Sequence, residues 1–62
     1  MKRADLVRFL LDNGCRLLWE GGRHSVFVNE ATGRVSTVPR HSAINDFVAR
    51  KICKDLELPG PV

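Results

Sequence analysis

The chain has 62 residues, from which we expect a single domain over residues 1–62 with a small core. Ten basic residues against seven acidic ones give a net charge of +3, which favours an anionic partner such as nucleic acid or an acidic protein. The sequence contains no apolar run of transmembrane length and no signal or lipidation motif, so we expect a cytoplasmic protein without a membrane partner.

The two cysteines, Cys15 and Cys53, both lie within apolar patterns, and we expect them to be buried and reduced. A zinc site that combines them with His24 and His41 is possible by residue count. The spacing of these four residues matches no zinc-finger pattern, however, and two of them belong to predicted core faces. We therefore expect neither a metal nor a cofactor.

The first predicted element is a helix over residues 4–13, followed by Gly14 at the position of a left-handed C-terminal cap. Its apolar residues recur at the spacing of one helical face, namely Leu6, Val7, Phe9 and Leu10. Asp5, Arg8 and Asp12 fall on the opposite face.

Three strands are predicted next, over residues 15–20, 24–28 and 34–38. In the first strand, Cys15, Leu17 and Trp19 point to one side, although the weak alternation leaves open whether Trp19 lies in the core or on the open face of the sheet. Turn-forming or chain-breaking residues separate and end the strands: Gly21-Gly22, the loop over residues 29–33, and Pro39.

A second helix is predicted over residues 45–58, with Asn45 or Ser42 as its N-terminal cap. Its apolar face consists of Val48, Ala49, Ile52, Cys53 and Leu56, and its end is marked by Pro59, Gly60 and Pro61. The order of elements is therefore α-β-β-β-α. This order predicts an α+β fold in which a three-stranded antiparallel sheet carries two helices on one face.

The solvent side of the second helix carries a basic stripe, because Arg50, Lys51 and Lys54 lie within about 100° of one another. Phe47 falls on the same stripe. Three interpretations of its ring stay open: it stacks on an RNA base, it anchors a partner protein, or it folds back onto the loop at residues 41–44. The stripe is either an RNA-binding surface or an ordinary solvated face.

Three motifs resemble the HicA family of bacterial toxins, in an order and at spacings that cover nearly the whole chain. They are Gly-x-His at Gly22–His24, Thr-Val-Pro-x-His at Thr37–His41, and Ala-Arg-x-Ile-x-x-x-Leu at Ala49–Leu56. The resemblance implies a double-stranded-RNA-binding-like fold and the activity of an mRNA interferase. It also implies that His24 is the catalytic histidine and that a HicB-type antitoxin covers the catalytic face. Many family members carry a second histidine where this chain has Ser25.

The residues around His24 suit RNA cleavage by the neighbouring 2′-hydroxyl, a reaction that needs no metal. Histidine can take up or release a proton near neutral pH, and arginine can bind phosphate at two points. We therefore expect His24 to act as general acid or base and Arg23 to hold the phosphate. Gly21 and Gly22 have no side chains, so the RNA backbone can approach them closely.

Two residues of the loop before the second helix are further candidates. Arg40 is a predicted phosphate contact. His41 is a second acid–base group, a phosphate contact, or a loop residue that binds nearby backbone.

Three functions are consistent with these observations. The first is a toxin that cleaves mRNA as a metal-independent endoribonuclease, monomeric when free and hetero-oligomeric with its antitoxin. The second is a non-catalytic RNA-binding module or lapsed toxin, and the third is an interaction protein whose basic face serves only an acidic partner. The predicted RNA contacts besides His24 are Gly22, Arg23, Arg40, His41, Phe47, Arg50, Lys51 and Lys54.

Overall fold

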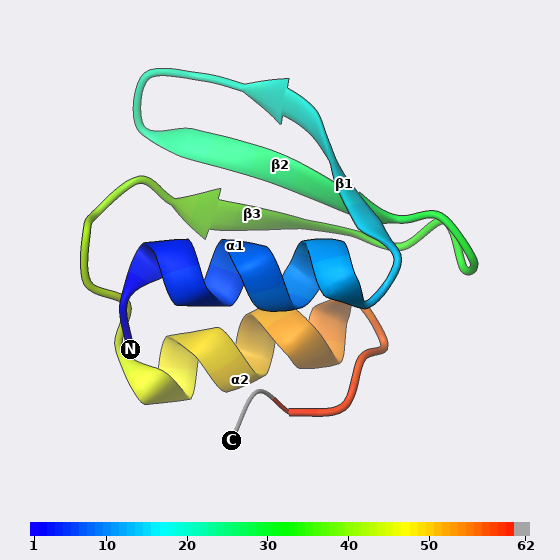
Figure 1. The fold of residues 1–62 in the computed structure, drawn as a ribbon. Coiled ribbons are helices and arrows are strands. Elements are labelled where there is room, and N and C mark those ends of the chain that lie inside the picture. Colours follow the sequence, from blue (N-terminus) through cyan, green and yellow to red (C-terminus); the bar gives the residue numbers. More distant parts are fainter. Residues whose placement is uncertain (61–62) are drawn as a thin grey trace.

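The computed structural model describes residues 1–60 and confirms the predicted order of elements (Figure 1). The elements are α1 (Arg3–Asp12), β1 (Cys15–Glu20), β2 (His24–Asn29), β3 (Val35–Pro39) and α2 (Asp46–Asp55). The strands form one antiparallel sheet in the order β1-β2-β3, and both helices cover the same face of it. Pro61, expected to help end the second helix, lies outside the described residues.

The core lies between the helices and the sheet and draws on every element. Its buried apolar residues are Leu6, Leu10, Cys15, Phe27, Val38, Ile44, Ala49, Ile52, Cys53 and Leu56. Val7 and Phe9 of α1 are only partly buried at the margin of the core. Val48 was predicted to lie on the apolar face of α2, but it is 36% exposed and is not part of the core. Both cysteines are buried and unpaired, as expected.

The first helix begins one residue earlier than predicted and ends at Asp12. Gly14 has a φ of 85°, which confirms the left-handed conformation expected after the helix. Because α1 stops there, the chain reverses and enters β1 directly at the buried Cys15.

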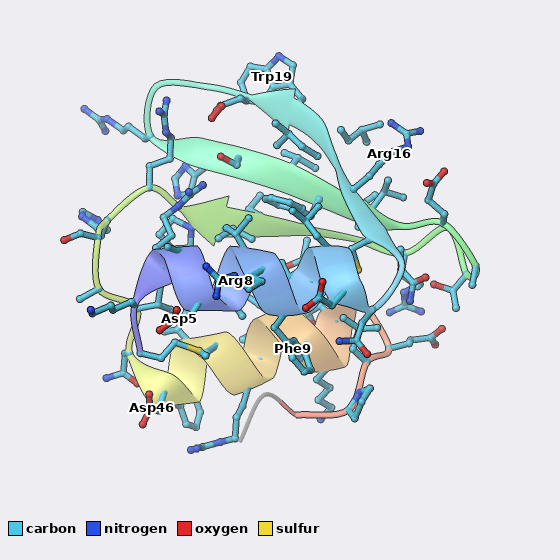
Figure 2. All side chains as sticks on the ribbon, viewed as in Figure 1. Asp5, Arg8, Phe9, Arg16, Trp19 and Asp46 are labelled. Atoms are coloured by element: carbon cyan, nitrogen blue, oxygen red, sulfur yellow. The ribbon has the colours of Figure 1, made fainter. Side chains whose placement is uncertain are left out.

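The first strand contains a β-bulge that changes which way its side chains point. Leu17 pairs with Phe27, but Trp19 pairs with Val26, so Leu18 is the extra residue. Phe27 is buried under the helices, whereas Trp19 lies on the opposite face of the sheet and is 61% exposed (Figure 2). The expectation that Trp19 shares a side with Cys15 and Leu17 is therefore wrong, and the indole is not part of the core.

The second strand begins as predicted and ends one residue later, whereas the third strand begins and ends one residue later than predicted. β2 extends to Asn29, whose buried side-chain amide donates to the Leu56 carbonyl at 2.7 Å. This bond satisfies a carbonyl at the end of α2 and ties the hairpin to the helix. β3 includes Pro39, which forms its last pair, opposite His24.

The second helix starts at Asp46, and Asn45 is its cap because the Asn45 Oδ1 accepts from the Phe47 amide at 2.7 Å. Neither α1 nor α2, the two helices within residues 1–60, is long and apolar enough to cross a bilayer.

The end of α2 differs from the prediction, because the helix stops at Asp55 rather than at residue 58. Glu57 adopts a left-handed conformation with a φ of 57°. Its amide donates to the Lys54 carbonyl at 3.0 Å, and the Leu58 amide donates to the Cys53 carbonyl at 2.8 Å. These two bonds form a Schellman motif with a glutamate at the position that glycine usually occupies. The predicted helix was too long because the apolar Leu56 and Leu58 still pack against the core after α2 has ended.

We expect Glu57→Gly to raise the free energy of unfolding by about 0.5–1 kcal/mol. Glycine adopts the left-handed conformation without the strain that a side chain causes, and this gain exceeds the larger loss of conformational entropy that glycine suffers on folding. Denaturant unfolding measures this change. The control is Glu57→Gln, which removes the ion pair at 3.8 Å with Arg34 but keeps the side chain. If Glu57→Gln stabilises as much as Glu57→Gly, backbone strain is not the cause.

Candidate active site

One end of the molecule gathers two loops that are far apart in the sequence. The β1–β2 turn and the β3–α2 loop lie together there, because β2 begins where β1 and β3 end (Figure 1). Between them is an open hollow of about 530 Å³, which is within the usual size range of ligand sites. Its lining consists of Gly22, Arg23, His24, Arg40 and His41, all predicted site residues.

His24 is the first residue of β2 and is held there by its pairing with Pro39. Two bonds join the flanking loops: the Arg40 amide donates to the Arg23 carbonyl at 3.2 Å, and the Arg40 Nη1 donates to the Gly21 carbonyl at 2.8 Å. The backbone around His24 is thus fixed from both sides, while its side chain remains exposed to solvent.

The two arginines of the hollow differ in whether their guanidinium groups already have partners. Arg40 already binds the Gly21 carbonyl, and its Nη2 lies 3.8 Å from the Glu20 carboxylate. Arg23 forms no ion pair within residues 1–60. Within residues 1–60, Arg23 is therefore the cation of this hollow without an ion-pair partner, whereas the guanidinium of Arg40 already bonds to the β1–β2 turn.

The two glycines of the turn have different surroundings. The indole of Trp19 covers Gly21 so closely that a Cβ atom there would collide with the ring. Gly22 has nothing within 4 Å of the corresponding position. Close approach of a ligand backbone is therefore available at Gly22 and not at Gly21.

Arg3 lies behind the hollow and was not singled out from the sequence. Its Nε donates to the Pro39 carbonyl at 2.8 Å, and its Nη2 donates to the Ser25 hydroxyl at 2.8 Å. Ser25 is fully buried, so the residue next to His24 has a structural partner and points away from the hollow. The only signal in the sequence was a cation in the first turn of a helix, where the helix dipole disfavours positive charge.

A second hollow, of about 410 Å³, lies on α2 and is lined by Phe47, Arg50, Lys51 and Lys54. This confirms that the predicted stripe forms one surface. The Phe47 side chain is 70% exposed, so the ring does not fold back onto the preceding loop. The Lys51 ammonium binds the Asp55 carboxylate at 2.9 Å.

A smaller hollow, of about 150 Å³, shares one lining residue with each of these two hollows. His24 also lines the first hollow, and Lys51 also lines the second. Thr37 and Pro39 of β3 form part of its lining. The predicted site residues of the loops and of α2 therefore line neighbouring hollows that have His24 and Lys51 in common.

The four residues considered for zinc do not come together. Cys15 and Cys53 lie in the core, whereas His24 and His41 are exposed, and no group of three potential ligands occurs within residues 1–60. Burial raises the pKa of both thiols, and the charge of Cys15 raises the pKa of Cys53 further. Protonated, buried thiols are poor nucleophiles and poor metal ligands.

The family model described as the HicA toxin of bacterial toxin–antitoxin systems matches residues 3–58, a span that includes every helix and strand and the whole lining of the first hollow. No curated protein and no solved structure matches the chain.

We expect Arg3→Met to lower the free energy of unfolding by about 2–3 kcal/mol, because it leaves the buried Ser25 hydroxyl and the Pro39 carbonyl without their charged donor. Denaturant unfolding measures the loss. The matched control is Arg8→Met on the exposed face of α1, which should change stability by less than about 0.5 kcal/mol. Equal effects of the two substitutions would show that the Arg3 bonds contribute nothing.

We also expect stability to fall in alkaline solution as the thiols ionise. Their folded-state pKa lies above the ordinary value of 9.0, so their contribution is complete below that value and is lost as pH rises through the higher folded pKa. Unfolding free energies measured across this range should decrease less steeply in the Cys15→Ala/Cys53→Ala variant. An unchanged slope would assign the alkaline loss to other groups.

Proposed function

The chain belongs to the HicA toxin family of bacterial toxin–antitoxin systems, and on that premise we propose that it is an endoribonuclease that cleaves mRNA without a metal, with His24 as its acid–base residue. The observation that supports this most directly is the first hollow. That hollow is lined by an exposed histidine, by an arginine that forms no ion pair within residues 1–60, and by an open glycine.

The chemistry follows from these three groups. His24 takes the proton of a ribose 2′-hydroxyl, whose oxygen then forms a bond to the adjacent phosphorus. The bond from phosphorus to the 5′-oxygen breaks, and that oxygen receives a proton. The Arg23 guanidinium balances the charge that builds up on the phosphoryl oxygens. Gly22 lets the sugar–phosphate backbone reach the histidine.

His41 lines the same hollow as His24, which supports a role beside the phosphate. In one form of the mechanism it donates the proton to the leaving 5′-oxygen. In the other, water donates that proton and His41 contacts the phosphate. If both histidines transfer protons, kcat/KM should pass through a maximum as pH rises. If only His24 does so, kcat/KM should show a single transition with pH.

A toxin of this family acts with an antitoxin. We propose a HicB-type partner that covers the His24 hollow, so that the chain is monomeric when free and hetero-oligomeric when inhibited. Acidic side chains on the partner would match Arg23 and the uncompensated cations of α2.

A non-catalytic RNA-binding protein is the second candidate, and one observation favours it. Ser25 occupies the position where many family members carry a second histidine, and its hydroxyl is buried and bound to Arg3. The neighbour of His24 therefore supplies no proton-transfer group, and catalysis depends on the histidines of the hollow alone.

We expect His24→Ala to lower the rate of RNA cleavage by about 100- to 10,000-fold, the usual contribution of one positioned acid–base residue. The measurement incubates each protein with an unstructured RNA in EDTA and separates the products on a gel. Wild-type activity should persist in EDTA, because the proposed chemistry uses no metal.

The His24→Ala protein, purified identically, also controls for contaminating nucleases. Its affinity for RNA should stay close to that of the wild type, which shows that the loss is chemical. If neither protein cleaves and both bind RNA equally, the nuclease proposal is wrong and the binding function stands.

A further inference from the structure

We propose that Phe47 is a stacking platform for an unpaired base, so that the RNA bound at His24 is single-stranded and continues across α2. The inference rests on the proposed function in taking RNA as the ligand. It adds a second contact region and a requirement for unpaired bases at that region.

The exposure of Phe47 is the first observation. At 70% it is the most exposed large apolar side chain within residues 1–60, although it sits on a helix that buries three other residues. The backbone beneath it is rigid, because the Phe47 amide is fixed by the Asn45 side chain at 2.7 Å. A ring held outward on a capped helix turn is available to a planar ligand without any rearrangement of the fold.

The charges around the ring are the second observation. Arg50, Lys51 and Lys54 line the same hollow, and within residues 1–60 only Lys51 among them has an ion-pair partner. Proteins that bind single strands combine aromatic side chains with a positive groove along the backbone in this way.

The third observation is that the hollow of Phe47 and the hollow of His24 share lining residues with the same small depression. His24 and Lys51 border the same small depression, and Lys51 also borders the hollow of Phe47. The one carboxylate in this connection, Asp55, is neutralised by Lys51 at 2.9 Å. The two hollows are therefore neighbours on one surface, and we expect a strand with its reactive phosphate at His24 to extend past Lys51 toward the ring.

Stacking on Phe47 requires a base with a free face. In a duplex both faces of a base are covered by its neighbours, whereas the bases of loops and single strands can turn outward onto aromatic rings. The ring thus selects unpaired RNA, and it does so with little sequence preference because every base has such a face.

The test measures binding in a His24→Ala background, which separates binding from cleavage. The probe is a single-stranded RNA that carries 2-aminopurine, a base whose fluorescence falls when it stacks. Adding Phe47→Leu should weaken binding by about 5- to 150-fold and abolish the quenching. Phe47→Tyr should retain both. These substitutions leave the core untouched, since the side chain is exposed.

Two charge variants complete the design. Lys54→Ala should retain the quenching but reduce the slope of log K against log salt by about 0.7, the value for one single-strand phosphate contact. Arg8→Ala, an exposed cation on α1, should change neither quantity.

Equal affinity and quenching for Phe47→Leu and its parent would overturn the inference. So would an equal loss of affinity for duplex RNA, or a loss confined to binding of the antitoxin. The nuclease proposal is judged separately by wild-type cleavage in EDTA. If the wild type cleaves but Phe47→Leu binds normally, only the stacking inference fails; if quenching depends on Phe47 but nothing is cleaved, only the nuclease fails.

Discussion

The guanidinium group of Arg3 joins the first helix to the ends of two strands, and the geometry of the candidate active site depends on this junction. One planar group donates both to the hydroxyl of Ser25 and to the carbonyl of Pro39. Ser25 follows His24 in the chain, and Pro39 is its cross-strand partner. Because two donors leave the same rigid group, α1 and the two strand ends cannot shift independently. The backbone at the exposed histidine is therefore held by two partly buried hydrogen bonds, while its ring stays open to a ligand.

This arrangement separates stability from chemistry in a very small protein. The core contains apolar side chains and thiols. The side chains proposed to react with or bind RNA lie outside the core, at the ends of loops and on one surface of α2. A 62-residue chain has little stability to spare, so placing charged groups inside would be expensive. Mounting His24 on a strand and Phe47 on a helix keeps both positions defined by regular backbone rather than by flexible loops.

The sequence was sufficient to predict the fold and the residues that line the candidate site, and each failure has an identifiable structural cause. Helical and strand periods predicted all five elements, and the predicted residues of the first hollow do meet. The side of Trp19 was wrong because a bulge at Leu18 shifts the alternation, and no residue type marks such a bulge. The end of α2 was wrong because Glu57 occupies a position that glycine usually signals. Arg3 was missed because its partners lie 22 and 36 residues away, beyond any local pattern.

The bulge at Leu18 has a consequence for how copies of the chain behave in a crowded solution. β1 is an edge strand, and a regular edge presents a row of unpaired amides and carbonyls on which a foreign strand can add. One extra residue breaks the spacing of that row and increases the local twist, so that a second edge cannot hydrogen-bond along its whole length. The irregularity thus hinders the addition of a foreign strand along the β1 edge of a sheet whose outer face is uncovered.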